Sequence, residues 1–278
     1  MTSTNLISSQ LSELSLRHAV TEYRRQIGDA GSAMLSFEDR LELMLNVELS
    51  ERCHRRFERR IKEAKLRIRA MPEEIDTKSA RGLPQALLSQ LLSLSWLRNH
   101  HHVLITGPTG IGKTYLACGL AMAAIRGNFT VRYFKCSNLL EKIGTCRLDG
   151  SYRLFVTRLS HIDLLIIDDW GISPIAVNGA RELLDIIDDR VGTSSLVICS
   201  QLPLSNWHQA LEEGTVADAI LDRIIHNGVR VELSGESMRK ITSSHFELSS
   251  TPEPPTGARH HDHVAAPQDG ASEDPGFE

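Results

Sequence analysis

The first hundred residues carry a helical pattern of apolar positions. Over residues 37–69, apolar side chains recur every three or four positions and therefore share one face. They are Leu41, Leu45, Leu49, Cys53, Phe57, Ile61, Ala64 and Ile68. This spacing predicts one long helix, with Met71 and Pro72 as its stop. Weaker patterns predict a single helix within residues 1–35 and another over residues 83–97.

Beyond residue 102 the pattern changes to short apolar runs separated by helical segments. The runs occupy residues 103–106, 131–135, 164–168, 196–200 and 229–233. Strands that alternate with helices indicate an α/β fold, with a five-stranded parallel sheet covered on both faces. The last thirty residues are rich in Pro, Ser, Thr, Gly and acids, which predicts a disordered tail. We therefore expect a helical N-terminal domain (1–78), an α/β domain (79–248) and a disordered acidic tail (249–278).

Composition favours a cytoplasmic protein. No apolar run approaches the length of a membrane span, and the first residues lack the charged and apolar segments of a signal peptide. The five cysteines are scattered, and none forms a C-x-x-C pair, as expected for reduced thiols.

The net charge of −4 conceals two regions of opposite sign. Residues 251–278 hold six acids and one arginine, a net −5, which leaves +1 for the rest of the chain. Residues 52–69 hold nine Lys or Arg and two Glu, a net +7. This basic segment suits contact with a phosphate backbone, and a solvated face that docks a neighbouring copy is the alternative.

A phosphate-binding loop lies between the first predicted strand and the next helix. Residues 107–114 read GPTGIGKT and match G-x-x-x-x-G-K-[ST] completely. Glycines let backbone N–H groups approach the phosphates, and the following helix directs its positive end at them. Lys113 would reach the β- and γ-phosphates, and Thr114 would ligate Mg²⁺. The expected nucleotide-binding residues are Gly107, Pro108, Thr109, Gly110, Ile111, Gly112, Lys113, Thr114 and Tyr115.

Two carboxylates stand at the end of the third predicted strand, in the stretch LLIIDD. A buried strand that ends in Asp places the group at the carboxyl edge of the sheet, beside the loop. Asp168 suits the magnesium shell, and Asp169 suits the activation of an attacking water. A base next to the metal ligand favours hydrolysis over transfer to a substrate hydroxyl. A turn or helix start is the alternative explanation of the two acids.

Four further residues each have two possible roles. Ser200 or Gln201, at the end of the fourth strand, would hydrogen-bond the γ-phosphate and sense hydrolysis. The alternative is that both residues only mark the point where the strand passes into a loop. Arg223, on an apolar helical stretch, forms a local salt bridge or acts as an arginine finger on a neighbouring copy. Arg239 poses the same question.

The combination of GPTGIGKT, LLIIDDWG, CSQLP, ADAILDRIIHN and GESMRK resembles the IstB-like ATP-binding proteins. These are the helper ATPases of bacterial insertion-sequence transposition, related to the DnaC helicase loaders within the AAA+ class. The similarity extends from about residue 36 to residue 240. The loop alone is generic, whereas the combination is specific.

The resemblance implies an AAA+ ATPase core with a helical N-terminal extension that binds ATP and Mg²⁺ between the protomers of a ring or helical homo-oligomer. Arg223 would be the finger acting in trans, and Arg239 a sensor facing the γ-phosphate. The protein would assemble on double-stranded DNA and recruit or stimulate a transposase. Residues 137–161 match the position of a DNA-facing insertion, although an amphipathic helix pair also explains them. Candidate DNA contacts are Arg55, Arg56, Arg59, Arg60, Arg147, Arg153 and Arg158.

The sequence departs from the AAA+ pattern in three ways. Asp169 stands where many members have Glu, which predicts slow hydrolysis without DNA or a partner. The usual sensor Asn is replaced by Ser200 and Gln201. Little sequence follows Lys240, which predicts a minimal or absent lid. A helicase loader that binds single-stranded DNA is the nearest alternative. A small-molecule kinase and a nucleotide-locked module without turnover are the others.

Overall fold

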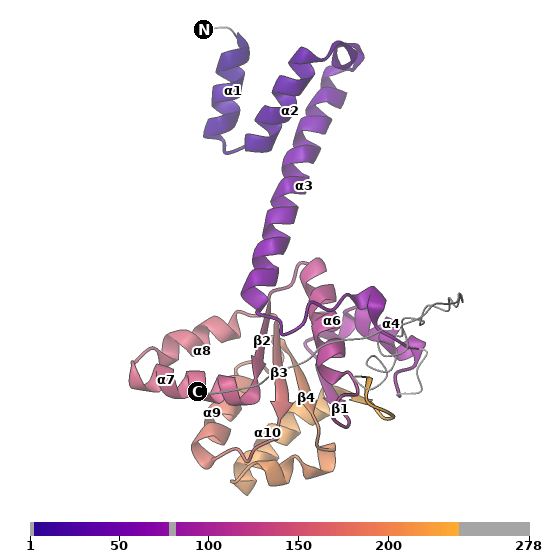
Figure 1. The fold of residues 1–278 in the computed structure, drawn as a ribbon. Helices are drawn as coiled ribbons and strands as arrows, with labels where there is room; N and C mark the ends of the chain where they lie inside the picture. Colours follow the sequence, from indigo (N-terminus) through magenta and orange to yellow (C-terminus); the bar gives the residue numbers. More distant parts are fainter. Residues whose placement is uncertain (1–2, 78–81, 239–278) are drawn as a thin grey trace, which may run out of the picture. The chain divides into compact units, whose positions relative to one another are not determined.

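The computed structural model describes residues 3–77 and 82–238, and its centre is one parallel sheet (Figure 1). The strands are β1 (His102–Thr106), β2 (Val131–Lys135), β3 (Leu164–Trp170), β4 (Ser195–Ser200) and β5 (Gly228–Glu232). Their order is β2-β3-β4-β1-β5, and every neighbouring pair is parallel. The predicted α/β class and five-stranded parallel sheet are confirmed.

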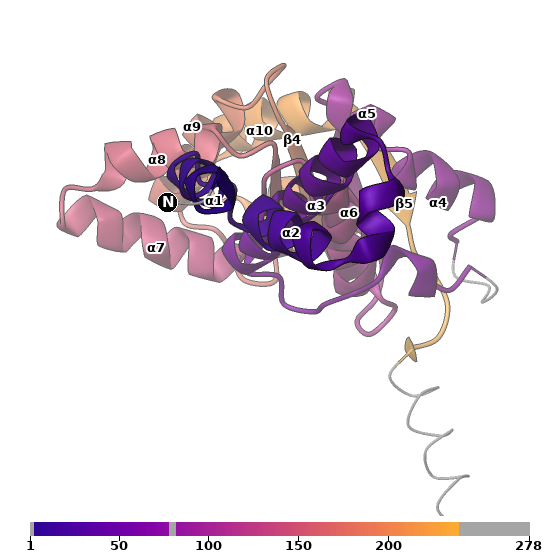
Figure 2. The ribbon, with the colours of Figure 1, turned by 90° about the horizontal axis from the view of Figure 1, so that it is seen from above.

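Alternate residues of each strand enter two separate cores, as the two-residue period of a strand requires. Ile105 and Val197 face one core, whose main helix is α6 (Lys113–Arg126). Leu104 and Ile198 face the other, formed with α7 (Cys136–Leu148), α9 (Val177–Asp188) and α10 (Gly214–His226). Both faces of the sheet are therefore covered, which explains the continuous apolar runs of the central strands. Figure 2 shows the same elements from above.

The remaining elements complete the described chain. They are α1 (Ser3–Glu13), α2 (Arg17–Gly28), η1 (Ala30–Met34), α3 (Phe37–Ala64), η2 (Pro72–Glu74), α4 (Gln85–Leu92), α5 (Ser95–Arg98), α8 (Tyr152–Ser160), η3 (Leu204–Asn206) and η4 (His208–Ala210). No helix among the described residues is long and apolar enough to cross a membrane. The predicted tail, and the segment after Lys240 where a lid would stand, lie outside these residues.

Two predicted helices are divided by residues in the left-handed conformation. The single helix expected in residues 1–35 is two helices and a 3-10 turn, because Ser15 has φ 60° and the Leu16 N–H bonds back to the Leu11 carbonyl. The helix expected over residues 83–97 becomes α4 and α5, because Leu94 has φ 58°. Hydrophobic spacing continues through both breaks and therefore did not reveal them.

The long helix begins as predicted and ends early. Ser36 and Asp39 form a reciprocal capping box at its start. Its end is Ala64 instead of a residue near Met71, because Lys65 adopts φ 51°. Ala64 is fully buried where α3 meets α6 and β2, and tertiary packing there replaces the last expected turns with a non-helical linker.

Only the second half of the apolar stripe of α3 packs into the hydrophobic core. Leu41, Leu45 and Leu49 remain 39–58% exposed. The buried positions of this half are Met44 and Glu48, which lie on the side packed against α2. A shared apolar face therefore does not mean a buried face in the first half of this helix.

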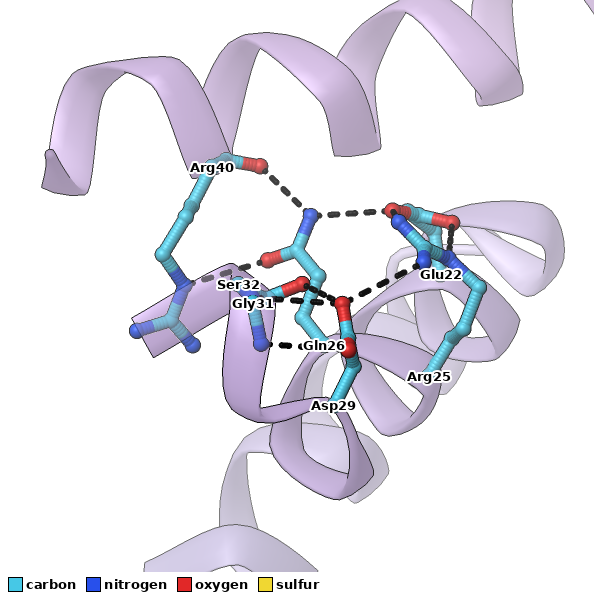
Figure 3. Close-up of polar contacts among 7 residues, drawn as sticks. All are labelled: Glu22, Arg25, Gln26, Asp29, Gly31, Ser32 and Arg40. Carbon is cyan, nitrogen blue, oxygen red and sulfur yellow. Dashed lines mark hydrogen bonds and ion pairs between the residues drawn. The ribbon is translucent and has the colours of Figure 1, made fainter. Parts of the chain in front are cut away.

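A polar cluster joins α2 to the first turns of α3 (Figure 3). The Gln26 amide is buried and donates to the Arg40 carbonyl at 3.0 Å and to Glu22 Oε1 at 3.0 Å. Arg40 Nε donates to Gln26 Oε1 at 3.3 Å. At the turn between the helices, the Asp29 carboxylate accepts the Gly31 and Ser32 N–H groups. The cluster satisfies the buried amide and fixes the turn.

Glu48 forms the second polar link between these helices. Its buried carboxylate accepts the His18 N–H at 2.9 Å and the Ala19 N–H at 3.3 Å, in the first turn of α2. Arg52 Nε donates to it at 2.7 Å. Burial alone would raise the pKa of Glu48, but Arg52 and the two N–H groups outweigh burial and hold this pKa below its ordinary value.

Glu48→Gln should therefore destabilise the packing of α2 on α3. We expect the free energy of unfolding to fall by roughly 1–3 kcal/mol, because the charged acceptor of three donors is lost. In the wild type the folded pKa is depressed, so this contribution is present above the unfolded pKa and disappears as pH falls through the folded pKa. Urea unfolding followed by circular dichroism at neutral and acidic pH measures both effects. The exposed Glu42→Gln is the matched control, and equal pH dependence of Glu48→Gln and wild type would contradict the assignment.

Candidate nucleotide-binding site

The phosphate loop connects β1 to α6, and two of its glycines are required by close neighbours as well as by their backbone conformation. Gly107 has φ +145° and Gly110 has φ +83°, conformations that side chains rarely adopt. A Cβ at Gly107 would lie 2.2 Å from the Leu233 carbonyl oxygen, and one at Gly110 would lie 2.2 Å from Ser237 Oγ. The segment after β5 therefore packs directly behind the loop and fixes its backbone.

Lys113 and Thr114 are the first two residues of α6, and their side chains have different partners. The ammonium of Lys113 donates to the carbonyls of Gly107 at 2.6 Å and Pro108 at 2.8 Å. Burial lowers the pKa of Lys113, although Asp168 and Asp169 act in the opposite direction. Lys113 is thus held inside the loop as a buried cation whose natural partner is a phosphate.

Asp168 is the centre of the polar contacts around Thr114. The side chain is 1% exposed, and its Oδ2 accepts from Thr114 Oγ1 at 2.8 Å and from the Tyr133 hydroxyl at 2.7 Å. Burial, followed by the bond to Asp168, raises the pKa of Tyr133, which keeps its hydroxyl protonated as a donor. A hydroxyl and a carboxylate oxygen side by side are hard ligands of the kind Mg²⁺ takes, so the residues fit this ion.

Asp169 lies next to this pair but has separate partners. Its backbone is left-handed, with φ 61°, and its N–H donates to Asp168 Oδ1 at 2.9 Å. Its Oδ2 lies 3.6 Å from Lys135 Nζ and 3.7 Å from Arg67 Nη1. Asp adopts this left-handed conformation more readily than most residues with a side chain.

Sequence analysis missed three residues that surround the acids: Arg67, Tyr133 and Lys135. Lys135 ends β2 and is the register partner of Asp168 on β3. Arg67 comes from the linker after α3. Strand order and the path of the linker place them here, and neither can be read from spacing along the chain.

The two sensor candidates are distinguished by their contacts. Gln201 Oε1 accepts from the hydroxyl of Thr109 in the phosphate loop at 2.6 Å. The Ser200 hydroxyl is buried and donates to the Trp170 carbonyl at 2.7 Å. Gln201 therefore faces the loop, whereas Ser200 secures the backbone after β3.

Arg223 lies on α10 and contacts α9. Its Nε donates to Asp188 Oδ1, and its Nη1 donates to the Ala219 carbonyl at 2.9 Å. The local salt bridge is therefore present within one copy, and a finger role in a neighbouring copy stays a prediction. Arg239 lies outside the described residues.

The candidate DNA contacts have unequal surroundings. Arg55, Arg56 and Arg59 are exposed on α3, and Arg153 and Arg158 are exposed on α8. Arg60 donates to Asn128 instead. Arg147 lies 3.1 Å from Glu182 and 3.5 Å from the centroid of the Tyr152 ring. Residues 137–161 form the helix pair α7–α8, and both explanations of this segment remain open.

Comparison with solved structures supports the fold. The chain superposes on DnaI with a TM-score of 0.53 and 17% identity, covering 59% of this chain and 91% of that one. It superposes on a DnaA bound to AMPPCP and single-stranded DNA with a TM-score of 0.52 and 16% identity, covering 66% and 56%. These similarities confirm the AAA+ fold expected from the sequence.

Sequence relatives identify the family. A putative insertion sequence ATP-binding protein of Sinorhizobium fredii is 40% identical over 231 residues, which are 83% of this chain and 94% of the relative. The putative ATP-binding protein of insertion sequence IS1162 from Pseudomonas fluorescens is 39% identical, over 71% and 86%. The family model described as IstB-like ATP binding protein matches residues 9–246. The chain therefore belongs to the IstB-like ATP-binding family.

Proposed function

We propose that this protein hydrolyses ATP with Mg²⁺ and uses ATP binding to assemble on duplex DNA in the cytoplasm, where it recruits or stimulates a transposase. The observation that carries the hydrolysis proposal is the contact between Thr114 Oγ1 and Asp168 Oδ2 at 2.8 Å, with a second carboxylate, Asp169, directly beside it. The two carboxylates proposed as metal ligand and base are therefore neighbours beside the loop. Membership of the family supports ATP as the nucleotide.

Each residue of the site has a distinct task in this proposal. The loop N–H groups and the start of α6 hold the phosphates, and Lys113 turns from the loop carbonyls to the β- and γ-phosphates. Thr114 and Asp168 would hold Mg²⁺, which would neutralise charge on the phosphates. Asp169 accepts the proton of the attacking water, and Gln201 lies close enough to Thr109 to respond to the γ-phosphate.

Two observations support the DNA and transposase parts of the proposal: the names of the sequence relatives and the exposed arginines of the chain. The sequence relatives are named for insertion sequences, which move by transposition. The exposed arginines of α3 and α8 supply the sequence-independent charge that a phosphate backbone needs. A trans-acting Arg223 would make each ATP site depend on a second copy.

Asp169→Asn tests the hydrolysis proposal. We expect ADP production to fall by a factor of about 100 or more, because the general base is lost, while ATP binding is retained. Turnover is measured with and without long duplex DNA, and binding is measured separately by nucleotide titration. If wild type produces no more ADP than Asp169→Asn, the protein is a nucleotide-locked module. If single-stranded DNA stimulates and duplex DNA does not, a helicase loader is the better assignment.

A further inference from the structure

Arg223 lies in the last turn of α10, and its guanidinium is divided between two partners of its own chain. Nε donates to the Asp188 carboxylate at the end of α9, and Nη1 donates to the Ala219 carbonyl one turn back. Nη2 donates no hydrogen bond within the described part of the chain, and the side chain stays 30% exposed. Arg223 is therefore bound in a single copy and yet accessible to a second anion.

The end of α9 is acidic where a helix favours cations. Asp185 and Asp188 lie in its last turn, Asp189 is the C-cap residue, and the last turn has no basic residue. The C-terminus of a helix carries partial negative charge, so carboxylates are unfavourable there unless a cation is near. Of the described residues, Arg223 is the only cation within ion-pair distance of Asp188. The compensating charge thus comes from α10.

The two helices are held together without this ion pair. Leu183 and Ile187 of α9 are buried in the same hydrophobic core as Ile220 and Ile224 of α10. An ion pair whose side chains are 30% and 52% exposed contributes little to folding beside such apolar burial. The pair therefore requires an explanation other than the stability of the fold.

Asp188 stands on a rigid support. Arg190, two residues further on, is completely buried and donates to three backbone carbonyls at 2.7–3.0 Å. The carbonyls belong to Leu159, Ile162 and Ser195. These bonds tie the turn after α9 to the end of α8 and to the start of β4. Because this support is fixed, Arg223 must leave Asp188 in order to reach a phosphate on a second copy.

We propose that Asp188 is a latch for the finger: its carboxylate holds Arg223 in a free copy and gives it up to the γ-phosphate of ATP bound by a second copy. A terminal phosphate offers more charge and more acceptor oxygens than one carboxylate, so it competes successfully for the guanidinium. The local salt bridge and the finger are then two states of the same residue. Asp188 is a positioning residue, because it acts through Arg223. The inference rests on the proposed function and adds how a free copy keeps its finger unavailable.

The exposure of the pair limits the strength of the latch. Exposed ion pairs shift an equilibrium by up to about five-fold, and salt screens them. Such a latch is weak enough for a phosphate to open. It is also strong enough to raise the protein concentration at which copies assemble around ATP.

The test compares Asp188→Asn with the matched control Asp189→Asn in the full chain. Asn keeps the size of the side chain and removes its charge, and Asp189 is an exposed neighbour outside the ion pair. ATP turnover per subunit is measured against protein concentration, without DNA. In Asp188→Asn the protein concentration at half-maximal turnover should fall by up to about five-fold, with maximal turnover unchanged. High salt should narrow this difference, and Asp189→Asn should match the wild type.

Self-association provides a readout that does not depend on hydrolysis. Sedimentation velocity with a non-hydrolysable ATP analogue should show tighter association of Asp188→Asn than of the wild type. Adding Asp188→Asn to Arg223→Ala should change nothing, because the latch then has no finger to hold. This double-mutant cycle separates an effect through Arg223 from a general effect of surface charge.

Three results with the variants would overturn the inference. Lower maximal turnover at an unchanged half-maximal concentration would make Asp188 a residue that orients the finger within the assembly. Identical curves for Asp188→Asn and wild type would reduce the pair to a contact between helices. An equal shift in the Arg223→Ala background would place the effect elsewhere on the surface.

A separate result with the wild type would remove the latch together with its premise. If turnover per subunit does not rise with protein concentration and the analogue induces no association, the trans-acting finger of the proposed function fails. That failure is recognised before any variant is compared. If the wild type associates with the analogue but produces no ADP, only the hydrolysis proposal fails, and sedimentation still decides the latch.

Discussion

Lys113→Met is expected to lower the affinity for ATP about 100-fold, equivalent to roughly 3 kcal/mol. Lys113 is 8% exposed, and its ammonium is already enclosed by the carbonyls of Gly107 and Pro108. Methionine keeps the apolar stem in this buried position and removes only the charge. The loss therefore reports the charge-assisted contact with the phosphates and not a collapsed loop.

Titration with a fluorescent ATP analogue measures this affinity, and circular dichroism checks that the variant is folded. Lys62→Ala is the matched control, because it removes an exposed lysine of α3. An affinity of Lys113→Met within a factor of about two of the wild type would mean that the loop holds nucleotide through its backbone alone.

Arg223→Ala is expected to lower ATP turnover by at least about 100-fold, since a finger on the γ-phosphate contributes strongly to phosphoryl transfer. In one copy, Arg223 bonds Asp188 and the Ala219 carbonyl, so it must reach a second copy to act. Wild-type turnover per subunit should accordingly rise with protein concentration and with long duplex DNA. The variant should lose both dependences.

Mixing two inactive variants tests whether the finger acts in trans. Copies with Arg223→Ala retain Asp169, and copies with Asp169→Asn retain Arg223. A site formed between one copy of each kind has both groups, so the mixture should recover a fraction of wild-type turnover. Arg181→Ala is the control, because it breaks a nearby ion pair between α9 and Glu213. A mixture of Arg181→Ala and Asp169→Asn copies should show no turnover beyond that of the Arg181→Ala copies themselves. A flat rate per subunit with no complementation would mean that each site is self-contained.

The structure also shows why local sequence signals located some residues and missed others. Gly107, Lys113, Thr114 and Asp168 belong to one strand–loop–helix unit and the end of one strand, and their contacts follow from that unit. Tyr133 and Lys135 reach Asp168 and Asp169 only because β2 pairs with β3. Arg67 arrives on a linker that the helical pattern assigned to α3.

By itself, the sequence determined the five parallel strands, the phosphate loop, the acid pair near the end of β3 and the family. These depend on spacing along the chain, where residue types and local backbone geometry are sufficient. Only the tertiary structure decided where α3 ends, that Leu45 and Leu49 stay exposed, and that Arg67 and Lys135 hold Asp169. The reason is physical: periodicity shows which side chains share a face, whereas the partner of that face is chosen by packing and charge from elements distant in sequence.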